Sequence, residues 1–349
     1  MGWRAATTTS SRKSSVRAEM ALTSRRRLTG LALLLGTSVL AMGCAAATAI
    51  PGQSPSVTIS RLTDEPVGLR TAPEVELLAA YELASPDRRF GGFSAIETDG
   101  RTLWLLSDRA TLWRAAFRLD RVTGALALED WRVGELLPDE ADRRALDSEA
   151  LALAPDGTLY AAFEHDDSVR RLRLEASGDW STERLHEGRL IEGAPRNQGL
   201  EALARLPDGM LVAISEGARL TRDVAAGALL ETVEPAEASV RPFGYAVAPG
   251  FSPVGAAVAK DRLYVLERSI GLLTGWQSRL TRTPVPPGDD WGTLVGEELI
   301  RINAGPLAEN HEGVAILDDA DGPATILLIS DDNQSALQRT LLLVFAYAG

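Results

Sequence analysis

Carboxylate side chains recur at both ends of short apolar segments in this sequence. In "NQGLEALARLPDGMLVAISEG" (residues 197–217), Glu201 and Glu216 bracket an apolar run that contains Asp208-Gly209. The Asp-Gly pair tolerates positive φ and favours a tight reversal, so the segment predicts a β-hairpin. The start of one strand of an antiparallel hairpin lies beside the end of the other, so both glutamates are expected at the same end. Carboxylates gathered in this way could bind a cation or transfer protons.

The same hairpin pattern occurs five times along the chain. Each copy has an apolar second arm rich in strand-forming residues, such as "MLVAISE" in the segment above. The copies span residues 93–109, 148–168, 197–217, 251–269 and 310–335, and the second copy places Glu149 and Glu164 at one end in the same way. The positions taken as equivalent, roughly 50 to 60 residues apart, are Ser94, Glu149, Glu201, Ser252 and Glu312. A strand-rich unit repeated at this interval is typical of a β-propeller.

The repeat therefore predicts an all-β fold, a β-propeller in which six blades are the favoured number and five or seven are alternatives. Segments 70–90 and 336–348, the second of which includes "RTLLLVFAYA", could complete a blade from both ends of the chain. A two-sheet sandwich is the competing architecture, but it does not predict so regular a repeat.

If the five hairpins are the inner strands of the blades, their acids meet at one mouth of the central channel. Clustered carboxylates repel one another unless a cation or an arginine compensates them. Calcium is bound by about six to eight oxygen atoms from carboxylates, amides, carbonyls and water. The expected ligands of such a calcium ion are Glu149, Glu201, Glu312, Asp331, Asn197 and Asn310. The ion could serve catalysis or only brace the structure, and both alternatives stay open.

Other polar residues near these acids could take part in catalysis. His311, between two of the expected ligands, or Glu201 could transfer protons. Arg109 and Arg268 directly follow strand-end acids and could bind an anionic substrate or pair with those acids. Ser94 lies in "GGFSAI", which is not the Gly-x-Ser-x-Gly motif of a nucleophilic serine.

The hairpin segments also resemble a known family. "GGFSAIETDGRTLWLLSDR" (91–109), "SEALALAPDGTLYAAFEH" (148–165), "NHEGVAILDD" (310–319) and the segment at 197–217 are similar to the phytase-like domain family, described as having esterase-like activity. The resemblance extends from about residue 75 to the end of the chain. It implies a propeller, an exported protein and a calcium-dependent hydrolase of phosphoric or carboxylic esters. The fourth copy departs from the pattern, because "FSPVGAAVA" has no acid at the position equivalent to Glu201.

The N-terminal residues have the features of an export signal. A basic segment with three consecutive arginines precedes the apolar run "LTGLALLLGTSVLAMG" (28–43). Gly43 followed by Cys44, the only cysteine, suits a lipoprotein cleavage site; an ordinary or a twin-arginine signal are alternatives. We predict an export signal over residues 1–43, lipidation at Cys44, a tether over 44–69 and a propeller domain over 70–349.

The charge balance narrows the range of partners. The formal net charge is −12, and the export signal is basic, so the remaining chain is still more acidic. This balance argues against binding to nucleic acid or to anionic lipid surfaces. We expect a small-molecule ester substrate, a location in the cell envelope or periplasm, and membrane contact only through the lipid anchor. The rival hypothesis is a non-catalytic envelope binding module with a structural cation site.

Overall fold

The computed structural model describes residues 54–186, 189–191, 193–195, 198–232, 239–288, 291–318 and 322–349. The chain divides into two units, residues 1–46 and 47–349, and all described residues belong to the second unit. The predicted export signal and Cys44 therefore lie outside the described residues. In the described ranges, no helix has the length and apolar character needed to span a membrane.

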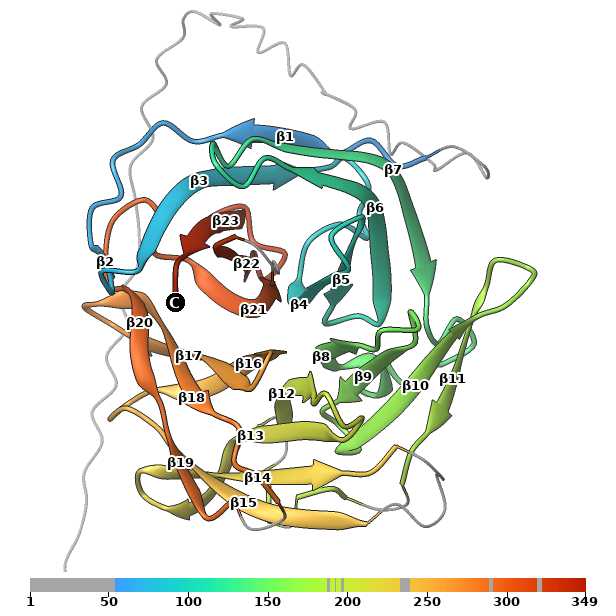
Figure 1. Ribbon diagram of the computed structural model, residues 1–349. Coiled ribbons are helices and arrows are strands. Elements are labelled where there is room, and N and C mark those ends of the chain that lie inside the picture. Colours follow the sequence, from blue (N-terminus) through green and yellow to red (C-terminus); the bar gives the residue numbers. More distant parts are fainter. Residues whose placement is uncertain are drawn as a thin grey trace, which may run out of the picture. The chain divides into compact units, whose positions relative to one another are not determined.

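The described chain forms five β-sheets, each built from an inner hairpin and further strands outside it (Figure 1). The first contains β4 (Phe93–Thr98), β5 (Thr102–Ser107), β6 (Thr111–Leu119) and β7 (Leu126–Glu135). The second contains β8 (Ser148–Leu153), β9 (Leu159–Phe163), β10 (Ser168–Leu174) and β11 (Trp180–Arg184). The third contains β12 (Leu200–Arg205), β13 (Leu211–Thr221), β14 (Val224–Leu230), β15 (Val240–Ala246) and β19 (Thr293–Val295). A short 3-10 helix (Arg143–Leu146) precedes β8.

The last two sheets recruit strands from the start of the described chain. The fourth contains β16 (Ser252–Ala259), β17 (Arg262–Gly271), β18 (Gly275–Pro284), β20 (Glu297–Ile302) and β2 (Leu69–Thr71). The fifth contains β21 (Asn310–Leu317), β22 (Ala324–Asp331), β23 (Thr340–Tyr347), β3 (Val75–Ala84) and β1 (Thr58–Arg61). The propeller thus begins at Thr58, inside the segment 44–69 that the sequence assigned to a tether.

The five sheets are the blades of a propeller. The innermost strands β4, β8, β12, β16 and β21 contact one another in this order, and β21 contacts β4 to close the ring. The all-β propeller is confirmed, but it has five blades where six were favoured. Segments 70–90 and 336–348 do complete a blade from both ends of the chain, because β3 pairs with β23. That blade already contains the hairpin at 310–331, so no sixth blade forms.

The turns of the inner hairpins have the predicted geometry. Gly157 and Gly209 have φ values of 87° and 101°, which the Asp-Gly sequences allow without strain. Lys260 takes a similar conformation in the fourth hairpin, with φ of 52°. All five turns lie at the same end of the ring, because the inner strands run in the same direction along the channel.

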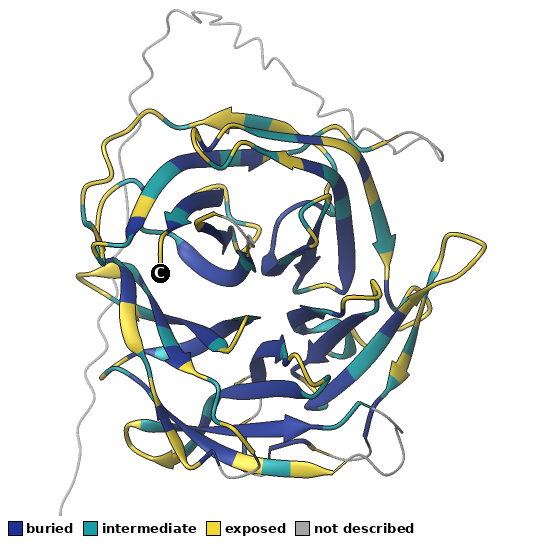
Figure 2. Ribbon diagram, viewed as in Figure 1, coloured by how far each residue is buried: buried dark blue, intermediate teal, exposed yellow. Residues whose placement is uncertain are grey.

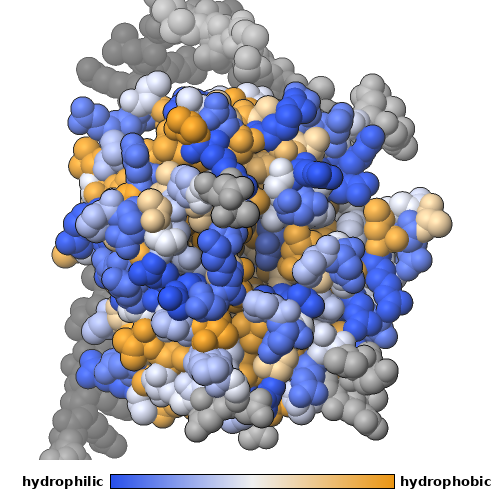
Figure 3. All heavy atoms as spheres, viewed as in Figure 1, coloured by the Kyte–Doolittle hydropathy of each residue, from blue (hydrophilic) through white to orange (hydrophobic). Residues whose placement is uncertain are grey.

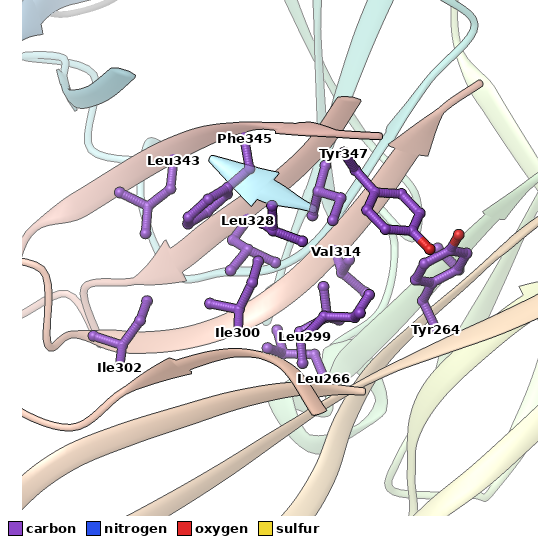
Figure 4. Packing of buried hydrophobic residues seen from close by; sticks show 14 of the residues in the cluster. Tyr264, Leu266, Leu299, Ile300, Ile302, Val314, Leu328, Leu343, Phe345 and Tyr347 are labelled. Carbon is purple, nitrogen blue, oxygen red and sulfur yellow. The ribbon is translucent and has the colours of Figure 1, made fainter. Parts of the chain in front are cut away.

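The core lies between the blades, where apolar side chains from neighbouring sheets interlock. Figure 2 shows that the inner strands are almost entirely buried, so both of their faces are apolar. Figure 4 shows one such layer between the fourth and fifth blades, where Leu266 and Ile300 face Leu328 and Phe345. On the face of the molecule seen in Figure 3, hydrophilic and hydrophobic residues are interspersed.

Candidate metal and active site at the channel mouth

Every inner strand carries a β-bulge at the same place. In β12, the pairing with β13 passes from Leu200 opposite Ser215 to Ala202 opposite Ile214, so Glu201 has no partner. The same interruption occurs in all five inner strands. The unpaired residues, which we call the bulge ring, are Ser94, Glu149, Glu201, Val254 and Glu312. A bulge re-aims a side chain, and the three glutamates and Ser94 line the axial cavity of the propeller.

The bulges correct one of the equivalences taken from the sequence. Val254, and not Ser252, occupies the bulge of the fourth blade. Ser252 lies two residues earlier and pairs with Arg268. The fourth blade therefore has an apolar residue in the bulge ring and an arginine beside it on the second strand.

A second set of side chains surrounds the bulge ring. Each of them follows the residue of the second strand that pairs with the inner strand just before the bulge. These residues, which we call the strand-end ring, are Asp108, Glu164, Glu216, Arg268 and Asp331. The fourth blade contributes the arginine, and each of the other blades contributes an acid. Both rings lie at the end of the channel that is opposite the hairpin turns. We call this end the channel mouth.

Arg268 of the fourth blade contacts acids of the third and fifth blades. Its guanidinium lies 3.3 Å from a carboxylate oxygen of Glu216 and 3.9 Å from one of Glu201, and it also forms an ion pair with Glu312. It donates a hydrogen bond of 3.0 Å to Oδ1 of Asn310. Although burial alone lowers the pKa of Arg268, the glutamates around it raise the pKa above its ordinary value. The arginine is therefore held as a cation among carboxylates.

Arg268 does not reach all the acids at the mouth. Two groups of three carboxylates have oxygen atoms within 4.8 Å of one another. The first group is Asp147, Glu149 and Glu164, and the second is Glu164, Glu201 and Glu216. Glu164 belongs to both groups, so five carboxylates from the second and third blades form one continuous set, which we call the acid cluster.

Burial and mutual repulsion favour the protonated forms of the acid cluster. Burial, reinforced by Glu201 and Asp147, raises the pKa of Glu149 well above its ordinary value. Burial also raises the pKa of Glu201, against the opposing effect of Arg268. The pKa of Glu164 is raised to about 7, chiefly by burial. The cluster must therefore hold protons near neutral pH or be compensated by a cation.

The donor set of the acid cluster fits a hard divalent cation. All the available ligand atoms are carboxylate oxygens, which calcium prefers, and they come from two adjacent rigid hairpins. The backbone N–H of Gly199 donates to Glu164 (3.1 Å), and a Cβ at Gly199 would lie 3.0 Å from Cγ of that glutamate. The close approach of this backbone fixes the carboxylate that the two groups share.

A family model described as "Phytase-like: Esterase-like activity of phytase" matches residues 88–334, which contain both rings. The chain belongs to the phytase-like family. The resemblance seen in the sequence is thereby confirmed. No curated protein matches the chain at a significant level.

Several solved structures resemble the fold of this phytase-like protein. Virginiamycin B lyase from Staphylococcus aureus with quinupristin is 11% identical, covers 82% of this chain and 99% of its own, and has a TM-score of 0.37. The PQQ-bound aldose sugar dehydrogenase from Streptomyces coelicolor is 14% identical, with coverages of 84% and 100% and a TM-score of 0.35. The phage phi92 endosialidase is 10% identical, with coverages of 84% and 70% and a TM-score of 0.45. Similarity at this level says nothing about what the phytase-like chain binds.

The expected metal ligands fall into separate groups in the phytase-like domain. Glu149 and Glu201 belong to the acid cluster. Glu312 and Asn310 are engaged by Arg268, and the amide of Asn310 also donates to Glu312 (2.8 Å). Asp331 lies in the strand-end ring, and burial raises its pKa to about 6. Asn197 lies outside the described residues.

The catalytic candidates are also separated. His311 is fully buried, and its Nδ1 lies 3.1 Å from the hydroxyl oxygen of Ser278. Burial lowers the pKa of His311 to about 4, and the residue does not line the axial cavity. This placement does not support a role as general acid or base. Arg109 is exposed at the mouth, with its Nε 3.8 Å from Asp108.

Asp147 was missed by the sequence analysis, although a signal existed. It stands two residues before Glu149, just as Asn310 stands two residues before Glu312. Glu164 and Glu216 were recognised as strand-end acids but were not proposed as ligands. The pairing of the hairpin strands places all three beside the bulge ring.

Proposed function

We propose that this protein is a divalent-cation-dependent hydrolase of anionic esters, with calcium as the favoured ion, and that it acts at the channel mouth. The observation that supports this proposal is the acid cluster, in which five carboxylates converge and Arg268 touches only two. The phytase-like family, with its esterase-like description, favours phosphoric and carboxylic esters as the substrate class.

Each group at the mouth has a proposed task. When bound, a divalent cation would polarise an ester oxygen and lower the pKa of a bound water. Asp147, Glu149, Glu164 and Glu216 supply oxygen ligands, and Glu201 exchanges a proton, because burial raises the pKa of its carboxyl group and favours the protonated form. Arg268 acts as a positioning residue. The exposed Arg109 is the cation available to bind the anionic group of a substrate.

A specific observation supports the alternative, a non-catalytic binding module with a structural cation. Ser94 is the hydroxyl residue that lines the axial cavity, and its Oγ donates to the carbonyl oxygen of Ser148 (2.7 Å). Its proton is therefore held by the backbone and not by a base. Among the described residues that line this cavity, no pair of nucleophile and base is present. For either function, we propose a location in the cell envelope with a lipid anchor at Cys44.

A metal titration distinguishes the two functions. Full-length protein freed of metal by a chelator would be titrated with calcium in the presence of chromogenic phosphate and carboxyl esters. We expect saturable turnover that is lost in Glu164→Gln and retained in Glu129→Gln, an exposed acid on β7 that lies outside the acid cluster. Calcium binding without turnover would favour the binding module. If no divalent ion gave binding or turnover, the cation would have no part in either proposed function.

A further inference from the structure

The turn between β17 and β18 presents unshielded apolar side chains to solvent. Leu272 and Leu273 have relative exposures of 107% and 100%, and Ile270 is 66% exposed. Residues 269–275 contain no charged side chain. Apolar groups gathered in this way mark contact sites for membranes or other proteins.

This turn projects from the channel mouth. β17 begins beside the turn at Lys260-Asp261, passes Arg268 in the strand-end ring and continues to Gly271. Leu272 follows Arg268 by four residues, so the turn extends about 10 Å beyond the ring. Trp276 pairs with Ile270 across the hairpin, and its ring centre lies 5.8 Å from the Arg268 guanidinium.

The neighbouring blades present apolar residues at the same end. On β13, Leu220 follows Glu216 of the strand-end ring by four residues and is 57% exposed. In the loop between β22 and β23, Leu337 is 94% exposed. The third, fourth and fifth blades are consecutive around the ring. Their mouth-side turns thus form a row of apolar tips: Leu220, Ile270, Leu272, Leu273 and Leu337.

The chain enters the propeller at this same end. Thr58 on β1 pairs with Ala84 of β3, and the adjacent Leu83 pairs with Thr340 of β23. Thr340 donates to a carboxylate oxygen of Asp332 (3.0 Å), directly after the strand-end ring. The first described strand therefore starts on the mouth side. A membrane tether before residue 54 would therefore join the propeller on the side of the mouth and the apolar tips.

We propose that the apolar tips dock on the surface of a zwitterionic phospholipid bilayer, with the channel mouth facing the lipid. Separate protruding tips suit insertion between headgroups, and an interfacial tryptophan beside them is common in membrane contacts. The acidic mouth disfavours anionic lipid, because like charges repel at the membrane surface. This contact adds a second membrane attachment to the predicted anchor and does not depend on whether the site hydrolyses esters.

Site-specific fluorescence tests the orientation. Because the chain has a single cysteine, the Cys44→Ser chain can be labelled with nitrobenzoxadiazole at one chosen position. Leu272→Cys places the label on a tip, and Val122→Cys is the matched control, since Val122 is 84% exposed in the turn between β6 and β7 at the opposite end. Both sites are exposed, so neither substitution removes core contacts. Phosphatidylcholine vesicles with a spin label in the acyl chains are then added.

We expect a blue shift for the Leu272→Cys label and quenching at least about twofold greater than for the Val122→Cys label. Including phosphatidylglycerol in the vesicles should reduce both the blue shift and the quenching of the Leu272→Cys label. Equal quenching at the two sites, or none at Leu272→Cys, would overturn the proposal. A blue shift that grows with protein concentration and needs no vesicles would also overturn it, because a second copy of the chain would then cover the tips.

Discussion

Arg268 of β17 occupies the position in its blade that Glu216 of β13 occupies in the preceding blade, and the two side chains form an ion pair at 3.3 Å. Around the strand-end ring, one cation therefore replaces an acid at one of five equivalent places. This replacement compensates the acids of the third and fifth blades. Among the described residues, the ion pairs of Arg268 do not include the acids of the second blade, which are Asp147, Glu149 and Glu164.

Removing Arg268 should destabilise the propeller strongly when no metal is present. Arg268→Met leaves three glutamates without their cation, and breaking a mostly buried ion pair in this way costs about 3–5 kcal/mol. Calcium should restore part of the loss. Urea unfolding in chelator and in calcium measures both effects. Arg118→Met, which breaks an exposed pair with Glu129, is the control and should cost less than about 1 kcal/mol. Equal losses in the two variants would contradict the role given to Arg268.

Calcium affinity should depend on the acid cluster and not on the full set of ligands expected from the sequence. Asp147→Asn and Glu149→Gln should each weaken binding by about tenfold or more, because each removes a carboxylate ligand. Glu312→Gln should have a smaller effect, since Arg268 engages that side chain. Titration calorimetry at fixed pH checks the order of the three variants. A larger loss for Glu312→Gln would restore the original ligand set.

The stability of the metal-free protein should fall as the pH rises toward neutrality. Burial raises the pKa of Glu164 from 4.5 to about 7, so between these values the folded state holds a proton that the unfolded state has released. The stabilisation linked to that proton is complete below pH 4.5 and is lost as the pH approaches about 7. Urea unfolding at about pH 5 and about pH 8 in chelator should show the fall. In calcium the fall should be smaller, and Glu164→Gln should also reduce it.

Substitution of His311 should affect stability more than turnover. His311→Gln perturbs a buried site beside Ser278 and should cost about 1–3 kcal/mol, because a buried polar group loses its partner. Ester turnover per folded molecule should stay close to that of the unchanged protein. Thermal unfolding measures the loss of stability. Rates of ester hydrolysis, corrected for the fraction of folded protein, measure turnover separately. A loss of turnover without a loss of stability would return His311 to the catalytic residues.

Local sequence signals predicted the hairpins well. Asp-Gly turns in four copies, Lys260-Asp261 in the other, and apolar second arms identified all five inner hairpins. Glu149, Glu164, Glu201 and Glu216 were placed correctly at one end. The blade count depended on the pairing of β3 with β23, which are separated by most of the chain. The sequence indicated that the two ends of the chain share a blade but not that β23 also pairs with β22 of the fifth hairpin, so the closing strands were counted toward an additional blade.

The misplaced site residues have two physical causes. Side chains of neighbouring residues in a strand point to opposite faces of the sheet. His311 and Glu312 are adjacent in sequence, and their side chains therefore point in different directions. The same alternation buries Glu267, which accepts a hydrogen bond from Tyr245 (2.7 Å), and sends Arg268 to the mouth. The second cause is the bulges, which shift the phase of every inner strand and led to Ser252 being aligned in place of Val254.

The joining of β3 to β23 also sets an order of events during biosynthesis. β3 is made early but lacks its partner until the last residues of the chain have emerged. Until then the ring stays open, and β3 and β22 expose unpaired edges that invite association with other strands. The contact of Arg268 with Glu312 joins blades four and five, so the arginine side of the mouth is also assembled late. The complete charge arrangement therefore forms only after β23 has been made and has paired with β3.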